Sequence, residues 1–372
     1  MTQESGQSFL TPFFQTPPKT DEIEITVFGK GFGECIVLSC GHNEFIVIDS
    51  FVNDDTKNAI AIDYMAWIGL PVSSIKRVVL THWHQDHIAG ISQILNQADK
   101  DVKLVLSPII KKEKFNEYMA LGFKGNNPST REFKNVYDFL LKNRGENLVL
   151  AGEHTRAYSN ERLDNAEVFT LSPRDADVFN YLQSIIMPPE NLKTSYSFPE
   201  DNLLSIVMLM KYGDDGFLFG SDMETKSNTN MGWKAIAKNY EHSRTRPSVF
   251  KVPHHGSENG HCDDVWKEIL KEFPISILTV YNKGYKLPKD EDVERIKNLS
   301  SNLYVVGEKS KKAKEIISKA RKVLNDVNIS VIPTDIGIVR YRKNMKTREY
   351  TIEHFGTVSV FNNEKLKVES LC

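Results

Sequence analysis

Short apolar runs separated by glycine residues follow a first segment of about 21 residues that shows no periodicity. Apolar runs at 23–28, 35–38 and 45–48 predict three β-strands. Residues 56–68 have the spacing of a helix, residues 77–80 predict a buried strand, and residues 88–97 return to a helical period. The polar residues 81–87 are therefore expected in a loop between a strand and a helix.

The alternation of strands and helices continues towards the C-terminus. Further strands are predicted at 102–106, 148–150, 168–171, 205–210, 216–219, 249–252, 275–280, 303–306, 329–332 and 338–341, and further helices at 225–239 and 311–325. A stretch rich in Lys and Asn, 111–143, has helical character and is expected as an insertion that could line or cover a cleft. Interleaved strands and helices favour an α/β fold with helices on the sheet faces.

The predicted organisation is one domain between two tails. We expect an N-terminal tail over 1–21, the domain over 22–355 and a C-terminal tail over 356–372. Within the domain, a helical insertion covers about 109–160 and a basic insert covers about 308–325. No short repeat or low-complexity linker divides the sequence, so a single domain is the simpler expectation.

Composition indicates the compartment and the partners of the protein, but says little about its reaction. Lys plus Arg (47) nearly balance Asp plus Glu (49), so a polyanionic partner would have to meet a local basic patch. The four cysteines are scattered and lack Cys-x-x-Cys spacing, which indicates free thiols in a reducing compartment. No signal peptide and no stretch approaching ~20 apolar residues is seen, so we expect a soluble, cytoplasmic protein without a membrane segment.

Four potential metal ligands are crowded into six residues directly after an apolar strand: His82, His84, Asp86 and His87. Crowding imidazoles and a carboxylate in a cleft costs hydration unless a partner replaces the lost water. A divalent metal ion is such a partner. His82 and His84, two apart in extended chain, can share one ion, while Asp86 and His87 can reach a second.

This His-x-His-x-Asp-His pattern resembles the motif of the metallo-β-lactamase superfamily. The resemblance implies a four-layer αββα sandwich and a hydrolase that uses one or two metal ions to generate hydroxide. It also covers later segments. Asp222 in FLFGSDME resembles the superfamily's Gly-Asp element, whose carboxylate bridges both metals, and Asp49 in FIVIDS matches an early acid that orients the site from behind. Asp86 is expected to take part in catalysis as well as in metal binding.

The sequence His254-His255-Gly256-Ser257 resembles the element that closes the site in one branch of the superfamily. That branch holds the hydrolase domain of DNA-uptake competence proteins, similar stand-alone hydrolases and phosphorylcholine esterases. Adjacent residues at a strand end face opposite ways, so one histidine is expected as a ligand and the other not. We assign His255 as the ligand and His254 as a phosphate contact or proton donor to the leaving group.

One ligand of the superfamily lacks a counterpart. Where many members place another histidine, this chain offers Asn202 or Ser205, and His154 is the alternative that could complete the first metal site. We expect two divalent ions, with zinc as the first choice and manganese as the alternative, because imidazole and carboxylate suit both.

The resemblance to this branch implies a phosphodiesterase, and most specifically a nuclease. A small-molecule esterase or phosphodiesterase, and a metal-binding regulatory subunit without turnover, remain alternatives. The basic segment contains Lys309, Lys311, Lys312, Lys314, Lys319, Arg321 and Lys322. It is either a solvated helix face or a contact for the backbone of a nucleic acid or another phosphodiester substrate. No partner protein is predicted.

Overall fold

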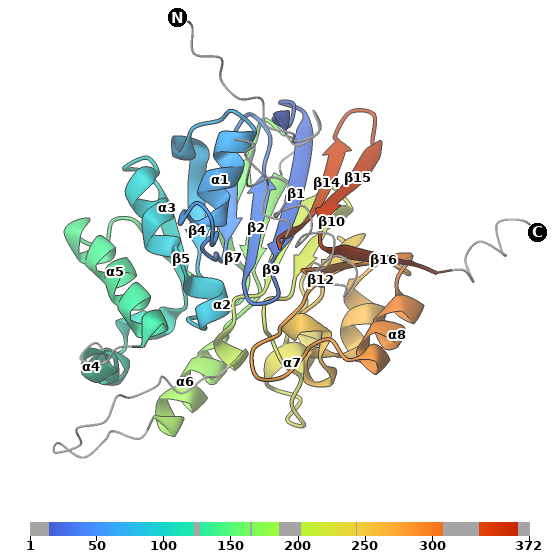
Figure 1. Cartoon of the computed structure of the whole chain (residues 1–372). Helices are drawn as coiled ribbons and strands as arrows, with labels where there is room; N and C mark the ends of the chain where they lie inside the picture. The colour runs from blue at the N-terminus through green and yellow to red at the C-terminus, as the bar shows by residue number, and fades with distance from the viewer. Residues whose placement is uncertain are drawn as a thin grey trace, which may run out of the picture.

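Two sheets, packed face to face, form the centre of the computed structural model, which describes residues 15–122, 127–163, 166–185, 202–242, 244–307 and 335–363 (Figure 1). The first sheet has the order β15 (Tyr350–Gly356), β14 (Gly337–Asn344), β1 (Glu22–Gly29), β2 (Glu34–Ser39), β3 (Phe45–Ile48), β4 (Ile75–Val79), β5 (Lys103–Leu106) and β6 (Leu148–Leu150). The second has the order β16 (Val358–Asn362), β13 (Asn302–Val306), β12 (Ile275–Thr279), β11 (Val249–Lys251), β10 (Asp215–Phe219), β9 (Met208–Tyr212), β8 (Ala166–Thr170) and β7 (Thr155–Asn160).

The two sheets share one pattern of strand directions. In the first, β1, β2 and β3 are antiparallel, and β4, β5 and β6 then continue parallel to β3. In the second, β8, β9 and β10 are antiparallel, and β11, β12 and β13 continue parallel to β10. Parallel neighbours end at the same edge of a sheet, so the loops after β3 and β4 lie together, as do those after β10 and β11.

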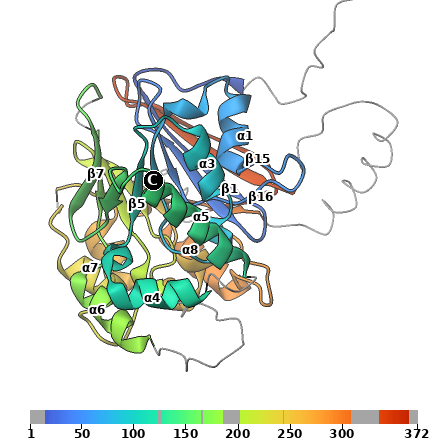
Figure 2. The same ribbon diagram turned by 90° about the vertical axis from the view of Figure 1, so that its left-hand side faces the viewer.

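Helices cover the outer face of each sheet, as the predicted αββα sandwich requires. The first sheet is covered by α1 (Ile60–Trp67), α3 (Ile91–Gln97), α4 (Glu113–Gly122), α5 (Pro128–Lys142) and α6 (Asp175–Ser184), which Figure 2 shows from their own side. The second is covered by α7 (Gly232–Lys238) and α8 (Asp290–Leu299). Alternation along β2 shows why both faces are apolar: Cys35 and Val37 pack towards the helices, while Ile36 and Leu38 pack between the sheets.

Two predicted helices are shorter than their apolar spacing suggested. The segment 56–68 becomes helical only at Ile60, because the residues before it fold around the Asp63 carboxylate. Asn53 Nδ2, Thr56 Oγ1 and Asn58 Nδ2 donate hydrogen bonds to it at 2.7, 2.6 and 2.9 Å. Likewise, a bridge between Thr225 and Gly232 closes a loop, so that only α7 remains of the predicted helix 225–239.

The prediction that 356–372 is a tail was wrong for its first part. Strand β16 pairs antiparallel with β13 along its whole length and so extends the second sheet. The predicted helix 311–325, the strand 329–332 and the basic segment fall outside the described residues, as do the first 14 residues of the N-terminal tail. In the part of the chain that is described, no helix is both long and apolar enough to cross a membrane.

Candidate metal centre

The loop after β4 and the short helix α2 (Gln85–Ile88) carry the crowded motif of the first half. His82 lies in the loop and is buried, and His84 is the residue before the helix. Asp86 and His87 lie in the helix and are also buried. The rings of His82 and His87 lie 4.2 Å apart between centroids, and those of His82 and His84 lie 4.4 Å apart. The motif thus folds into one compact group of side chains.

The loops after β10 and β11 carry the residues of the second half. Asp222 follows Ser221, whose φ of 48° turns the backbone, and the amide of His254 donates a hydrogen bond of 2.9 Å to the carbonyl of Ser221. His254 and His255 have φ values of 47° and 53°. The pair therefore lies in a left-handed turn and not at an extended strand end, so the reason given above for separating them was wrong. Their side chains still face different partners.

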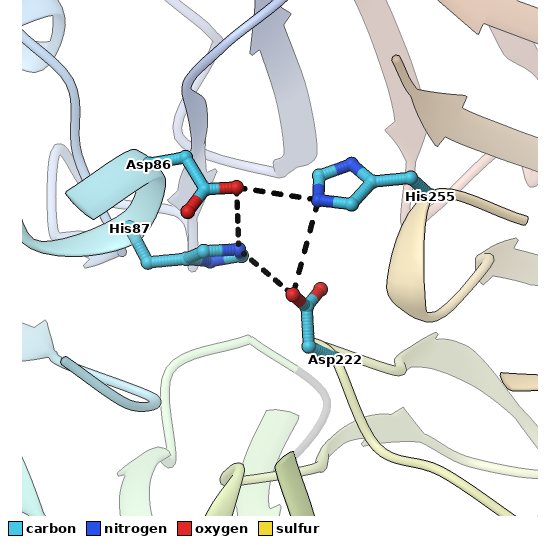
Figure 3. Close-up of side chains that lie close together, drawn as sticks. All are labelled: Asp86, His87, Asp222 and His255. Carbon is cyan, nitrogen blue, oxygen red and sulfur yellow. Dashed lines mark ion pairs between the residues drawn. The ribbon is translucent and has the colours of Figure 1, made fainter. Parts of the chain in front are cut away.

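Four side chains from the two halves converge on one point, as Figure 3 shows. Asp86 Oδ2 lies 3.3 Å from His255 Nε2 and 3.6 Å from His87 Nε2. Asp222 Oδ2 lies 3.4 Å from His87 Nε2 and 3.8 Å from His255 Nε2. One ligand atom from each residue can lie within 4.8 Å of all the others, which is the spacing of a set that could hold one ion.

A second set shares Asp222 with the first. His82, His84 and Asp222 also offer atoms within 4.8 Å of one another, and His82 Nε2 lies 3.6 Å from Asp222 Oδ2. The structure thus brings together all six side chains predicted as ligands, divided between two sets with one carboxylate in common. Two sets that share a carboxylate are groups that could hold metal ions.

The orientation of the imidazoles fits a metal. In each of the three buried rings, Nδ1 has a partner in the protein: His82 lies 2.9 Å from Thr81 Oγ1, His87 lies 2.8 Å from Asp49 Oδ2, and His255 lies 3.2 Å from the carbonyl of Thr279. The opposite Nε2 atoms, and Oδ1 of Asp222, are buried without a hydrogen-bond partner in the described part of the chain. Ligating histidines are typically held in this way, with the second nitrogen fixed by the protein.

The buried charges of the site also favour a bound cation. Asp49, Asp86 and Asp222 are all buried, and burial of three carboxylates is costly without positive charge beside them. Burial alone would raise the pKa of Asp222, but the imidazoles of His87 and His255 outweigh burial and hold that pKa well below its ordinary value. Burial alone would lower the pKa of His87, but Asp222, Asp86 and Asp49 outweigh it and raise that pKa. The buried carboxylates therefore favour positive charge at the centre of the candidate metal site.

Asp49 contacts residues of both sets, and with His82 and His87 it offers a third group of atoms within 4.8 Å of one another, so its role as an orienting acid stays a prediction. Its carboxylate accepts hydrogen bonds from the Thr81 amide at 2.8 Å and the Thr81 hydroxyl at 2.7 Å, in addition to its contact with His87. Burial raises its pKa, and the contacts with His87 and Thr81 work against that rise. Asp49 thus fixes both the loop that carries His82 and the ring of His87.

The alternative ligand His154 lies elsewhere. Its Nε2 atom lies 3.0 Å from the carbonyl of Asn239, and its ring lies 5.5 Å from that of His242, so it cannot complete the first set. Asn202, by contrast, lines the site: its Nδ2 atom lies 3.3 Å from His254 Nε2 and donates a hydrogen bond of 3.0 Å to Glu224 Oε1.

A buried support for His255 was not predicted from the sequence. Thr279, at the end of β12, contacts His255 Nδ1 and donates a hydrogen bond from its hydroxyl to Glu34 on β2. Lys251, the last residue of β11, lies with its Nζ atom 2.6 Å from the Glu34 carboxylate, and both side chains are almost fully buried. A lone buried Glu followed 217 residues later by a buried Lys gives no local pattern, so only the fold reveals this pair.

The two sets lie on a polar cavity of about 490 Å³. Besides the metal-set residues His84, Asp86, Asp222 and His255, it is lined by Phe32, Trp83, Gln85, Asn127, Ser129, Asn202, Glu224, His254, Asn259, Tyr281, Lys283 and Tyr285. Sequence reasoning missed Glu224 and Asn259, which hydrogen-bond each other at 2.9 Å beside His254. Their closeness in sequence to Asp222 and His254 was the signal that could have singled them out.

Comparison with known proteins gives the family. The model of the metallo-beta-lactamase superfamily matches residues 28–260, which is more than half of the chain and includes every residue of both sets. No curated protein matches. Similar solved structures include the metallo-beta-lactamase SMB-1 in a complex with mercaptoacetic acid (13% identity, TM-score 0.31), in which 56% of this chain matches 66% of that chain, just under two thirds of its length.

Two further similar structures are the Rm3 metallo-beta-lactamase and the short form of human tRNase Z. The first is 10% identical with a TM-score of 0.34, over 66% of this chain and 81% of that chain. The second is 11% identical with a TM-score of 0.32, over 62% of this chain and 77% of that chain. With the family model spanning both halves of the sandwich, the chain belongs to the metallo-β-lactamase superfamily, whose members are metal-dependent hydrolases.

Proposed function

We propose that the protein is a phosphodiesterase, and specifically a nuclease, that works with two divalent ions, zinc first and manganese as the alternative. The observation that carries the proposal is the pair of ligand sets sharing Asp222 at the surface of an open polar cavity. His82, His84 and Asp222 would hold one ion, and Asp86, His87, Asp222 and His255 would hold the other. Bound there, such ions lower the pKa of water and neutralise charge that develops on phosphorus.

The residues of the chain supply orientation and a proton. Asp49 holds His87 and, through Thr81, the strand end that carries His82. His254 lines the cavity without belonging to either set, and its Nδ1 atom lies 3.1 Å from Asn259 Oδ1. A histidine so placed can contact a non-bridging phosphate oxygen or donate a proton to the leaving oxygen, a role worth about 100-fold or more.

The narrower proposal of a nuclease has two supports. The segments around Asp222 and His254 resemble the branch that contains the DNA-uptake competence proteins. The basic segment of the sequence carries the positive charge that a phosphate backbone would attract. Nuclease activity and the choice of metal therefore need a direct test.

Metal content and substrate range together make that test. Purified protein is analysed for metals, and the same preparation is assayed on bis-p-nitrophenyl phosphate, single-stranded DNA, duplex DNA and p-nitrophenyl acetate. We expect about two ions per chain and cleavage of the phosphodiester and of DNA. Cleavage of the small phosphodiester alone would reject the nuclease, preference for the acetate would favour an esterase, and bound metal without any turnover would favour a regulatory subunit.

A further inference from the structure

An aromatic wall borders the cavity on the side of His255. It is formed by Phe32, Tyr281, Lys283 and Tyr285, all of which line the cavity. Phe32 comes from the turn between β1 and β2, and the other three come from the loop that follows β12. The sequence analysis assigned no role to any of them.

Hydrogen bonds hold the two segments of the aromatic wall together. The amide of Asn282 donates a hydrogen bond of 2.7 Å to the carbonyl of Gly31, which ties the second loop to the turn that carries Phe32. Tyr281 and Leu287 exchange amide-to-carbonyl hydrogen bonds of 2.9 and 2.8 Å, which close the loop at its base. The two segments of the aromatic wall are therefore fixed relative to each other.

The rings form a continuous apolar path from the metal sets to solvent. The ring of Tyr281 lies 5.3 Å from that of His255, 5.5 Å from that of Phe32 and 5.1 Å from that of Tyr285. The ring of Tyr285 is 60% exposed at the outer end of this path. An exposed ring beside a candidate reaction centre is typical of a binding subsite for a planar group.

The position of Lys283 indicates which kind of planar group the aromatic wall would bind. Its Nζ atom lies 4.4 Å from the centre of the Phe32 ring, and it donates a hydrogen bond of 2.7 Å to Gln85 Oε1 next to Asp86. A cation already occupies that aromatic face, so a quaternary ammonium group such as choline would be repelled. A neutral planar base attached to an anionic phosphate gains both the ring contact and the positive charge.

We propose that the aromatic wall binds the base of a nucleoside phosphodiester whose phosphate lies at the metal sets. This inference rests on the proposed phosphodiesterase function and narrows its substrate to nucleoside esters, in preference to choline or simple alkyl esters. Stacking on aromatic side chains tolerates every base, so the subsite would not by itself read a sequence.

Three substrates with one leaving group test the inference. The p-nitrophenyl phosphodiesters of thymidine, choline and methanol release the same phenol and differ only in the group that the protein retains. We expect kcat/KM for the thymidine ester to exceed that for the methyl ester by about 5- to 100-fold, as base stacking would provide. The choline ester should be no better than the methyl ester. A choline ester preferred over the thymidine ester would overturn the assignment.

Variants of the aromatic wall assign the preference to its residues. Tyr285→Leu should lower the thymidine-to-methyl ratio of kcat/KM by about 10-fold, and Lys283→Met should lower the thymidine-to-choline ratio. Tyr350→Leu, which removes a ring of similar exposure (54%) on β15, is the matched control and should leave both ratios unchanged. Unchanged ratios in Tyr285→Leu would also overturn the assignment.

Failure of the proposed function looks different. If none of the three esters is cleaved by metal-loaded protein, the phosphodiesterase proposal fails, and calorimetric titration with thymidine 5′-monophosphate still tests the subsite. Binding of this nucleotide that weakens about 10-fold in Tyr285→Leu, but not in Tyr350→Leu, would support the subsite alone. Equal binding by wild type and Tyr285→Leu would overturn it.

Discussion

The first edge of the site, where β3 and β4 end, and the second edge, where β10 and β11 end, have the same arrangement of strands but use their acidic residues differently. At each edge, an antiparallel strand is followed by a parallel one, β3 by β4 and β10 by β11. The third residue after β4 is His82, and the third after β11 is His254. Each edge also carries an acid, Asp49 directly after β3 and Asp222 three residues after β10.

The two acids differ in how many of their carboxylate oxygens already have a hydrogen-bond partner in the protein. Asp49 accepts three contacts from Thr81 and His87, so its carboxylate is fully used in holding the first edge together. Asp222 keeps Oδ1 without a partner in the described structure and turns Oδ2 towards three imidazoles. A similar position can thus serve as a support or as a ligand, and the hydrogen bonds of the carboxylate decide which.

The largest effect should follow removal of the shared ligand. Asp222→Ala is expected to lose both ions and to lower phosphodiester hydrolysis by at least about 1000-fold, because each ligand set loses a charged member. Metal analysis and initial rates measure this. Asp215→Asn, an acid at the opposite end of the same strand β10, is the control that should keep both ions. Two ions and near-normal turnover in Asp222→Ala would refute the shared role.

The adjacent histidines should separate binding from proton transfer. His254→Gln is expected to keep two ions per chain and to lower kcat by about 100-fold, as loss of a proton donor does. His255→Gln should instead reduce the metal content, because only His255 belongs to a ligand set. The reverse outcome, metal loss in His254→Gln with full metal content in His255→Gln, would exchange the two assignments.

The supporting acid should have a smaller effect than the ligating one. Asp49→Asn removes the charge that holds His87 Nδ1 and should weaken metal affinity by about 10- to 100-fold, the usual effect of losing a residue that orients a ligand. Competition with a chromogenic chelator measures the affinity. If Asp49→Asn lost both ions as completely as Asp222→Ala, the distinction between support and ligand would be wrong.

The smallest effect concerns stability at the far end of β10. Asp215 accepts hydrogen bonds from the amide of Gly216 and from Lys343 Nζ at 2.7 and 3.0 Å, and its pKa is lowered because these contacts outweigh the effect of burial. A lowered folded-state pKa stabilises the protein above the unfolded-state value of about 3.9, and that stabilisation is lost as the pH falls through the folded-state pKa. Asp215→Asn should therefore cost about 1–2 kcal/mol at pH 7.

Urea unfolding of wild type and Asp215→Asn across a pH series measures that difference. The two free energies of unfolding should begin to converge as the pH falls below the unfolded-state pKa of about 3.9, and they should meet below the lowered folded-state pKa, where the wild-type carboxyl is neutral as well. A constant difference at all pH values would mean that the charge of Asp215 does not contribute.

The sequence predicted the α/β class and the first edge of the site because their signals are local, whereas the four-layer αββα arrangement was implied by the family resemblance. Short apolar runs mark β1 to β5, and one loop of seven residues holds four of the candidate ligands. The second edge depended on resemblance, because the segments around Asp222 and His255 do not crowd candidate ligands as residues 82–87 do. Strands β15 and β16 were missed because most of their residues are exposed or half-exposed at the sheet edges, so no buried face imposes an apolar pattern.

The contacts that were missed join residues distant in the sequence. Thr279 and Glu34 are separated by 245 positions, and Lys251 meets Glu34 only when the two sheets pack together. His154 shows the opposite error: a histidine in a plausible interval was considered as a ligand, although the sheet places it beside His242. Spacing along a chain predicts which residues a loop presents, but not which loops meet.

The division of ligands between the two sheets gives the candidate metal centre a thermodynamic consequence. His82, Asp86 and His87 follow the first sheet, while Asp222 and His255 follow the second, so neither ligand set exists until the sandwich closes. A bound ion would act as a cross-link between the layers, and by mass action each tenfold excess of free ion over its dissociation constant would add about 1.4 kcal/mol to the free energy of unfolding. The apparent affinity for metal would then depend on the fraction of the protein in which the two sheets are packed together.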